Sequence, residues 1–214
     1  KKLFQEERFP EIIFEIESLT TEENRSSALH NLLGVCRVTQ KTRSDRDIEY
    51  AFKDFETAFE KDNLGEISLD ALCNHVKLCA EMGRRESNLV NKMIVAEKMY
   101  LKAEKKFSKN EKYIGHGLDI YKYLLKHEER IRKADELISL KKLNKLFGTI
   151  YINTHMYINK WGQKDFWKFQ KNFAKLFKVY DAKKLSKIDI NKEKIKVGFL
   201  SPDYHKAHSV TYFI

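Results

Sequence analysis

Two histidines near the end of the sequence, His205 and His208, carry the side chains best suited to proton transfer. An imidazole titrates close to neutral pH and can accept or position a proton. Asp203 and Ser209 flank them, and we interpret both as helix caps or loop braces, because free backbone amides at a helix start stabilise such groups. Taken alone, His208 is better explained as a helix-start histidine that binds the loop backbone than as a catalytic group.

These residues follow a short apolar segment, residues 195–200, whose residue types are typical of a β-strand. Ser201 and Pro202 end it. We therefore expect the carboxyl end of a parallel strand, followed by a loop and a helix. Ligand-binding loops of α/β folds lie at such strand ends.

The rest of the chain has to position this strand, loop and helix. Its sequence predicts that it consists of helices. Only eight glycines and two prolines interrupt the 214 residues. The tetratricopeptide pattern pairs a Leu-Gly helix with a second helix bearing small-x3-aromatic-x2-small residues. In the clearest unit, a first helix begins near Ser26 or Ser27 and carries Leu33-Gly34, and its partner carries Ala51, Phe55 and Ala58.

A second unit shows the same spacing 45 residues later, at Ala96, Tyr100 and Ala103, after a helix predicted from Leu69 to Met82. A third begins with Tyr113-Ile114-Gly115 in a helix reaching about Lys126, with a partner over 128–140. Near the start, Phe9, Ile12, Ile16 and Leu19 resemble the second helix of a further unit. Such repeats bury their apolar stripes against neighbouring repeats and form a solenoid with a binding groove.

An aromatic-rich stretch follows residue 140. Asp165 is predicted to cap a helix whose apolar positions are Phe166, Phe169, Phe173, Leu176 and Phe177. Lysines interleaved with aromatics can stack nucleic-acid bases. We expect the aromatics on one helix face and the lysines on the other, which favours packing with snorkelling lysines over base stacking.

Charge and cysteines restrict the function classes. The net charge is +10, and residues 141–196 hold 15 lysines, no arginine and 4 acidic residues. Binding to nucleic acid explains this positive charge less well than lysines on solvated helix faces do, since base and phosphate recognition usually recruits arginine. Cys36, Cys73 and Cys79 lack paired spacing, so we expect buried thiols and neither disulfides nor a metal site. With no signal peptide or membrane span in the sequence, we expect a cytoplasmic protein without a membrane partner.

The segments IKVGFLSPD (195–203) and HSVTYFI (208–214) resemble the first strand, loop and helix of the catalytic domain in the O-GlcNAc transferase and SPINDLY glycosyltransferase family. The order of regions is similar too, with tetratricopeptide repeats first. The resemblance implies a mainly α chain in three regions. These are degenerate repeats at 1–140, an aromatic- and lysine-rich helical connection at 141–193, and the truncated start of a Rossmann-like (GT-B) lobe at 194–214.

The resemblance also implies an activity. Family members transfer a sugar from a nucleotide donor, with UDP-GlcNAc favoured here over GDP-fucose, to Ser or Thr hydroxyls without a metal or other cofactor. His208 is the counterpart of the family's active-site histidine. The spacing from Asp203 to His208 is one residue longer than in the family, so His205 competes for this role. A fragment ending at Ile214 is expected to be inactive by itself.

The family's acceptor proteins lie along the repeat groove, where asparagines hold their backbone. The resemblance places Asn74 at such a position, whereas the matching residue of the preceding unit is Leu32, with Asn31 one position away. We therefore expect acceptor proteins or peptides as partners. The alternative is a non-catalytic repeat scaffold that binds partner proteins.

Overall fold

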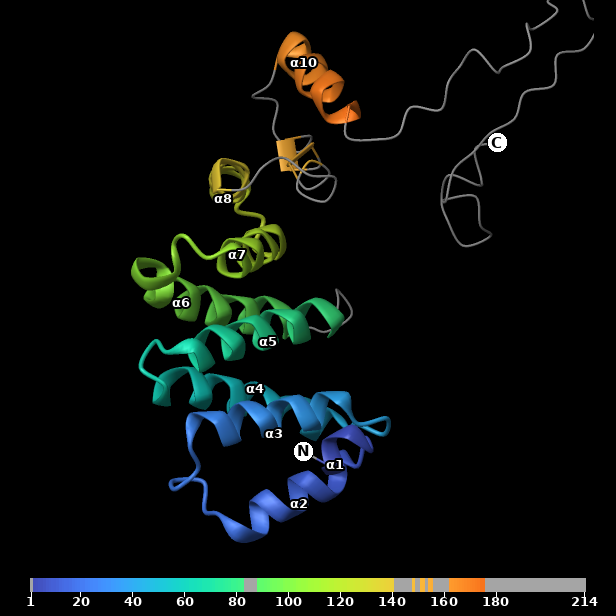
Figure 1. Cartoon of the computed structure of the whole chain (residues 1–214), viewed down its shortest axis with the longest axis vertical. Helices are drawn as coiled ribbons and strands as arrows, with labels where there is room; N and C mark the ends of the chain where they lie inside the picture. Colours follow the sequence, from blue (N-terminus) through green and yellow to red (C-terminus); the bar gives the residue numbers. More distant parts are fainter. Residues whose placement is uncertain are drawn as a thin grey trace, which may run out of the picture. The chain divides into compact units, whose positions relative to one another are not determined.

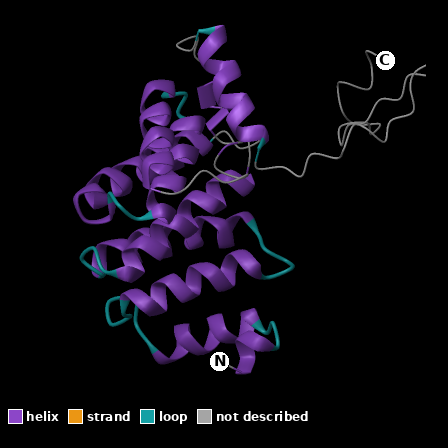
Figure 2. Ribbon diagram, turned by 45° about the horizontal axis from the view of Figure 1, so that its top comes forward, coloured by secondary structure: helices purple, strands orange, loops and turns teal. Residues whose placement is uncertain are grey.

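The computed structural model describes residues 2–82, 88–140, 148, 151–152, 154–155 and 162–175. Every regular element within these residues is a helix, as Figure 2 shows. The expected mainly α class is therefore confirmed for this part of the chain. The βα element expected at 194–214 lies outside the described residues and stays a prediction.

The helices follow one another in pairs (Figure 1). Each helix from α1 to α8 contacts its neighbours in sequence, and α5 also contacts both α3 and α7. This stacking of pairs is consistent with a helical repeat. The helices are α1 (Lys2–Gln5), α2 (Phe9–Leu19), α3 (Ser27–Thr39), α4 (Asp45–Lys61), α5 (Glu66–Met82), α6 (Leu89–Phe107), α7 (Glu111–Tyr123), α8 (His127–Leu140) and α10 (Gln163–Ala174).

Polar caps define the starts of three of these helices. Ser26, Ser44 and Asn110 each accept a hydrogen bond from the backbone amide three residues further on. Asp47 completes a capping box with Ser44 by binding its backbone amide at 2.8 Å. The predicted start of α3 near Ser26 is confirmed, whereas α5 begins at Glu66, three residues before the predicted Leu69.

The two small-aromatic-small motifs form the core between helices, as expected. All six residues are at most 1% exposed: Ala51, Phe55 and Ala58 on α4, and Ala96, Tyr100 and Ala103 on α6. Because small residues leave room for a neighbouring backbone, these helices pack closely against the preceding ones. Cys36, Cys73 and Cys79 are free and buried, as predicted, and burial raises the pKa of the Cys36 thiol to about 11.

Glycines allow the closest approaches between helices. A Cβ atom at Gly34 would overlap the Phe55 ring, which confirms the role of the Leu33-Gly34 motif. In the third unit the sequence pattern pointed to Gly115, but a Cβ atom there would meet no other atom within 4 Å. Gly117 takes this role instead, since its Cβ would overlap the Tyr100 hydroxyl. Two residues further along a helix, the side chain points to a different neighbour.

This difference predicts opposite effects for two alanine substitutions on α7. Gly117→Ala is expected to destabilise the protein by about 1–3 kcal/mol, because the added methyl overpacks a buried site. Gly115→Ala is expected to stabilise it by about 0.5–1 kcal/mol, since alanine favours helix and nothing obstructs it. Urea unfolding of both variants tests this assignment. Destabilisation by Gly115→Ala and not by Gly117→Ala would show that Gly115 makes the close approach between helices, as the sequence pattern suggested.

Ion pairs connect successive second helices at regular intervals of sequence. In each pair the carboxylate lies on the earlier helix, and the lysine lies on the later one or, for Lys126, immediately before it. The partners are 42 or 43 residues apart between α4 and α6, and 29 apart between α6 and α8, so the third unit is shorter. The pairs are Glu49–Lys92, Glu60–Lys102, Glu97–Lys126 and Glu104–Lys133.

Helix α2 buries less of its apolar stripe than the sequence suggested. Phe9 and Ile12 are buried against Cys36 of α3, but Leu19 is 82% exposed. Leu19 therefore does not belong to the buried stripe. It is the last residue of α2.

Helix α10 also begins differently from the prediction. Its N-cap is Gly162, and Asp165 lies inside the first turn, where a carboxylate interacts favourably with the helix dipole without capping the helix. The Phe169 ring lies 4.9 Å from that of Tyr151, whose hydroxyl donates a 2.7 Å hydrogen bond to Asp135 of α8. The predicted apolar positions Leu176 and Phe177 lie outside the described residues.

Candidate functional site

The predicted site residues divide into two groups. Asp203, His205, His208 and Ser209 lie outside the described residues, so their roles stay predictions. Asn74 lies on α5 and is half-buried. The structure therefore bears on the predicted acceptor-binding residue and its surroundings.

Asn74 pairs with Asn31. Its side-chain nitrogen donates a 3.0 Å hydrogen bond to the side-chain oxygen of Asn31 on α3. The repeat pattern matched Asn74 with Leu32, but the residue of α3 that contacts Asn74 is Asn31. Leu32 instead packs against the apolar cluster formed by α2 and α3. Because one residue rotates a side chain by about 100° around a helix, packing decides which of two neighbours faces α5.

The asparagine pair leaves N–H donors and a carbonyl acceptor for a ligand. An asparagine amide offers two N–H donors and a carbonyl acceptor. Within the described residues, the pair uses one N–H of Asn74 and the carbonyl of Asn31. The remaining Asn31 amide group and the Asn74 carbonyl match the C=O and N–H groups of a peptide backbone. This assignment of the amide orientations follows the hydrogen bond between them.

His116 occupies the position on α7 that the repeat interval relates to the asparagine pair. Asn31, Asn74 and His116 are 43 and 42 residues apart, the same intervals that separate the ion-paired residues of α4 and α6. We call these three residues the amide-imidazole row. Nδ1 of His116 is buried and has no hydrogen-bond partner within the described part of the chain. The sequence analysis missed His116, although its interval was the available signal.

Burial and two cations keep the His116 ring neutral at neutral pH. Burial is the larger cause, and Lys77 and Lys112 add to it, so that the pKa of His116 falls to about 4. Lys112 in turn pairs with Asp70 of α5 at 3.4 Å. Asp119, further along α7, has a raised pKa because it is largely buried. The row therefore combines neutral hydrogen-bonding groups with flanking charges of both signs.

The depressed pKa of His116 predicts a loss of stability in mild acid. The unfolded chain takes up a proton near the ordinary value of 6.5, whereas the folded ring takes it up near 4. Stability present above pH 6.5 is therefore lost as the pH falls towards 4, by about 2–4 kcal/mol from this residue.

Urea unfolding between pH 7 and pH 4, compared between the parent and His116→Asn, measures this contribution. The variant is expected to lose less stability over this interval. The difference between the two proteins removes the contribution of His75, whose pKa burial also lowers. Parallel pH profiles for the two proteins would contradict the prediction.

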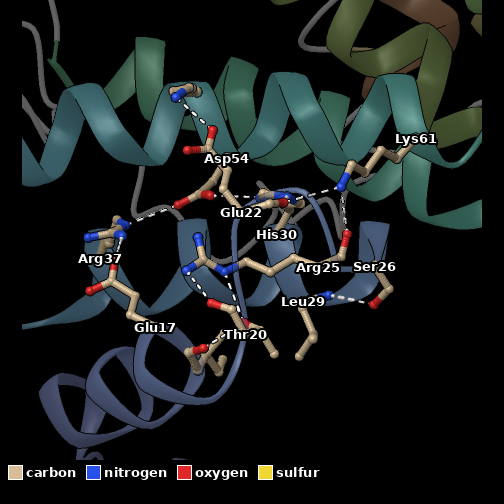
Figure 3. A network of polar contacts seen from close by, with 12 residues as sticks. Glu17, Thr20, Glu22, Arg25, Ser26, Leu29, His30, Arg37, Asp54 and Lys61 are labelled. Atoms are coloured by element: carbon tan, nitrogen blue, oxygen red, sulfur yellow. Dashed lines mark hydrogen bonds and ion pairs between the residues drawn. The ribbon is translucent and has the colours of Figure 1, made fainter.

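A buried polar network joins α2, α3 and α4 (Figure 3). Asp54 of α4 accepts hydrogen bonds from Nδ1 of His30 and Nε of Arg37, both on α3 and both at 3.0 Å. Arg37 also pairs with Glu17 of α2. Burial opposes the charge of Arg37, but its bonds to Glu17 and Asp54 outweigh burial and raise its pKa. The network thus ties three helices together.

Lys61 of α4 holds the loop between α2 and α3, which adjoins this network. Nζ of Lys61, at the end of α4, lies within 2.8–3.3 Å of the carbonyl oxygens of Glu22, Glu23 and Arg25. A cation that donates to several carbonyls fixes a loop that has no regular structure of its own. The loop therefore holds Glu22 where its carbonyl oxygen meets Nε2 of His30 at 3.3 Å.

The His30–Asp54 pair looks like part of a catalytic site, but its surroundings indicate a structural role. His30 is 1% exposed, and both of its partners, the Asp54 carboxylate and the Glu22 carbonyl, are acceptors. Both ring nitrogens are therefore occupied by protein partners, and neither is open to a substrate. We therefore assign this network to stability.

The described residues hold no group of three or more His, Cys, Asp or Glu side chains that could bind a metal. Likewise, none of the helices in the described ranges combines the length and the apolar character needed to cross a bilayer. Comparison of the chain with protein families, with curated proteins and with solved structures gives no match.

Proposed function

We propose that the stacked helices bind an extended polypeptide along the face that carries Asn31, Asn74 and His116. The observation that carries this proposal is the hydrogen bond between Asn31 and Asn74. It places two side-chain amides of neighbouring first helices side by side, and within the described residues it leaves N–H donors and the Asn74 carbonyl unused. Amides can bind a peptide backbone without regard to its side chains, which suits a site that accepts many protein sequences.

We further propose that this docking surface serves a protein O-glycosyltransferase. The support comes from the sequence, where segments 195–203 and 208–214 resemble the start of the O-GlcNAc transferase-type catalytic domain. In this proposal UDP-GlcNAc is the favoured donor, and Ser or Thr hydroxyls of the docked protein are the acceptors. The remaining catalytic lobes would have to follow Ile214 in the same protein.

The test uses the protein as its gene encodes it, with labelled UDP-GlcNAc, labelled GDP-fucose and protein acceptors. The double variant Asn31→Ala/Asn74→Ala is expected to raise KM for a protein acceptor by about 10- to 30-fold, since each lost hydrogen bond contributes about 1 kcal/mol. Its kcat should change little, because these residues do not touch the reacting atoms. Asn91→Ala is the matched control, because Asn91 is exposed on α6 and bonds only to Asn88 within the described residues.

The results separate this proposal from a non-catalytic scaffold. The same asparagine pair would serve a scaffold, because amides bind a peptide whether or not chemistry follows. Binding of proteins that weakens in the double variant, without turnover of either donor, would establish the scaffold. Turnover with a KM unaffected by the double variant would keep the transferase and remove the docking role of the asparagine pair.

A further inference from the structure

The outer face of α10 carries an exposed tryptophan among lysines. Trp167 is 55% exposed. A surface hollow of about 490 Å³ is lined by Trp167 and by Lys164, Lys168 and Lys171, which lie three residues before, one after and four after it. These spacings place all four side chains on neighbouring positions of one helix face.

This arrangement departs from the sequence prediction in one respect. Phe169 and Phe173 point inward, against Tyr151 and Gly148, as expected for a packed face. Trp167, in contrast, lies on the lysine face. The prediction that every aromatic of this helix would lie opposite the lysines was therefore wrong for Trp167. That prediction was the main argument against base stacking.

The lysines of this face are available to an anionic ligand. Lys164, Lys168 and Lys171 are exposed, and in the described part of the chain they form no ion pair with a carboxylate. They belong to the segment 141–196, which holds 15 lysines against 4 acidic residues. An indole ring offers a stacking surface for any base, and flanking ammonium groups neutralise phosphates.

We propose that the Trp167 face of α10 binds single-stranded nucleic acid without sequence preference. The face has the two parts such binding requires, a ring that stacks on a base and cations on either side of it for the backbone. The absence of arginine in residues 141–196 agrees with backbone binding rather than base-specific recognition.

An anionic membrane surface is less well matched to the same face. Interfacial helices bury a continuous apolar face in the lipid. On α10 the apolar face is occupied by protein contacts of Phe169 and Phe173, which leaves a single tryptophan outside. One ring is enough for stacking on a base but provides little area for insertion into lipid.

The test measures fluorescence anisotropy of labelled single-stranded oligo(dT) and oligo(U) with the full chain at two salt concentrations. Trp167→Ala is expected to weaken binding by about 5- to 150-fold, the effect of losing one stacked base, and Trp167→Phe to weaken it less. The triple variant Lys164→Gln/Lys168→Gln/Lys171→Gln is expected to reduce the slope of log K against log salt by about 2. Because these side chains are exposed, circular dichroism should show unchanged helix content.

Matched variants make the result decisive. Lys98→Gln/Lys105→Gln/Lys109→Gln removes the same charge from exposed positions of α6 and the turn after it, and is expected to change binding much less. Equal losses in the two triple variants, with no effect of Trp167→Ala, would show diffuse charge attraction and overturn the proposal. Absence of oligonucleotide binding at low salt would also overturn it, as would binding to phosphatidylserine vesicles alone.

Discussion

Replacing Asp54 by alanine is expected to lower the free energy of unfolding by about 3–5 kcal/mol, the typical cost of removing one partner from a buried ion pair. Asp54 is 7% exposed, and it accepts hydrogen bonds from His30 and Arg37, which are buried as well. Alanine leaves both donors without this acceptor. Water replaces the carboxylate poorly, because His30 and Arg37 are themselves at most 7% exposed.

The neighbouring residue on α4 provides the control. Lys53 pairs with Glu22 at 2.7 Å, but the two side chains are 61% and 57% exposed. Lys53→Ala is therefore expected to cost about 0.2–1 kcal/mol, as for other exposed pairs. Urea unfolding followed by circular dichroism compares the two variants. Equal, small losses would show that water reaches the Asp54 network and that the network does not tie α2, α3 and α4 together.

Replacing His208 by alanine is expected to reduce sugar transfer by about 10²- to 10⁴-fold, the usual contribution of a general base. This prediction rests on the proposed transferase activity and on the resemblance of segment 208–214 to the family's active-site helix. It is measured as kcat for labelled UDP-GlcNAc and a protein acceptor, in the protein as its gene encodes it. Acceptor binding should stay unchanged, because the proposed docking residues lie on α3, α5 and α7.

His205→Ala discriminates between the two candidate histidines. If the longer spacing after Asp203 leaves the register of His208 intact, His205→Ala should retain most of the activity. A large loss in His205→Ala together with an active His208→Ala would transfer the proposed role to His205. A transferase that tolerates both substitutions would contradict the proposed histidine base.

Much of the helical arrangement could be predicted from local patterns. Leu33-Gly34 and the motif around Phe55 identified α3 and α4, and Ser26 marked the start of α3. The motif around Tyr100 identified α6 in the same way. These patterns are informative because a repeat buries its apolar positions against neighbours of the same kind, so the spacing on each helix reports directly on the packing.

The candidate site was only partly predictable. Asn74 was recognised, but its partner Asn31 was placed one position away from the groove, and His116 was not considered. Matching Asn74 with Leu32 assumed that equivalent residues occupy the same angle around both helices. A rotation of one residue between α3 and α5 is enough to exchange Asn31 for Leu32 on the face that meets Asn74.

The sequence by itself determined the mainly α class of the described residues, the pairing of helices and the burial of the small-aromatic-small motifs, because each depends on side chains within one or two helical turns. Only the tertiary structure decided which glycine approaches Tyr100, which asparagine meets Asn74 and that Trp167 lies among lysines. Only the tertiary structure also brought Glu17, His30, Arg37 and Asp54 from three helices into one buried network. Such contacts depend on the rotation and offset of one helix against another, which are set by the packing of all their side chains together.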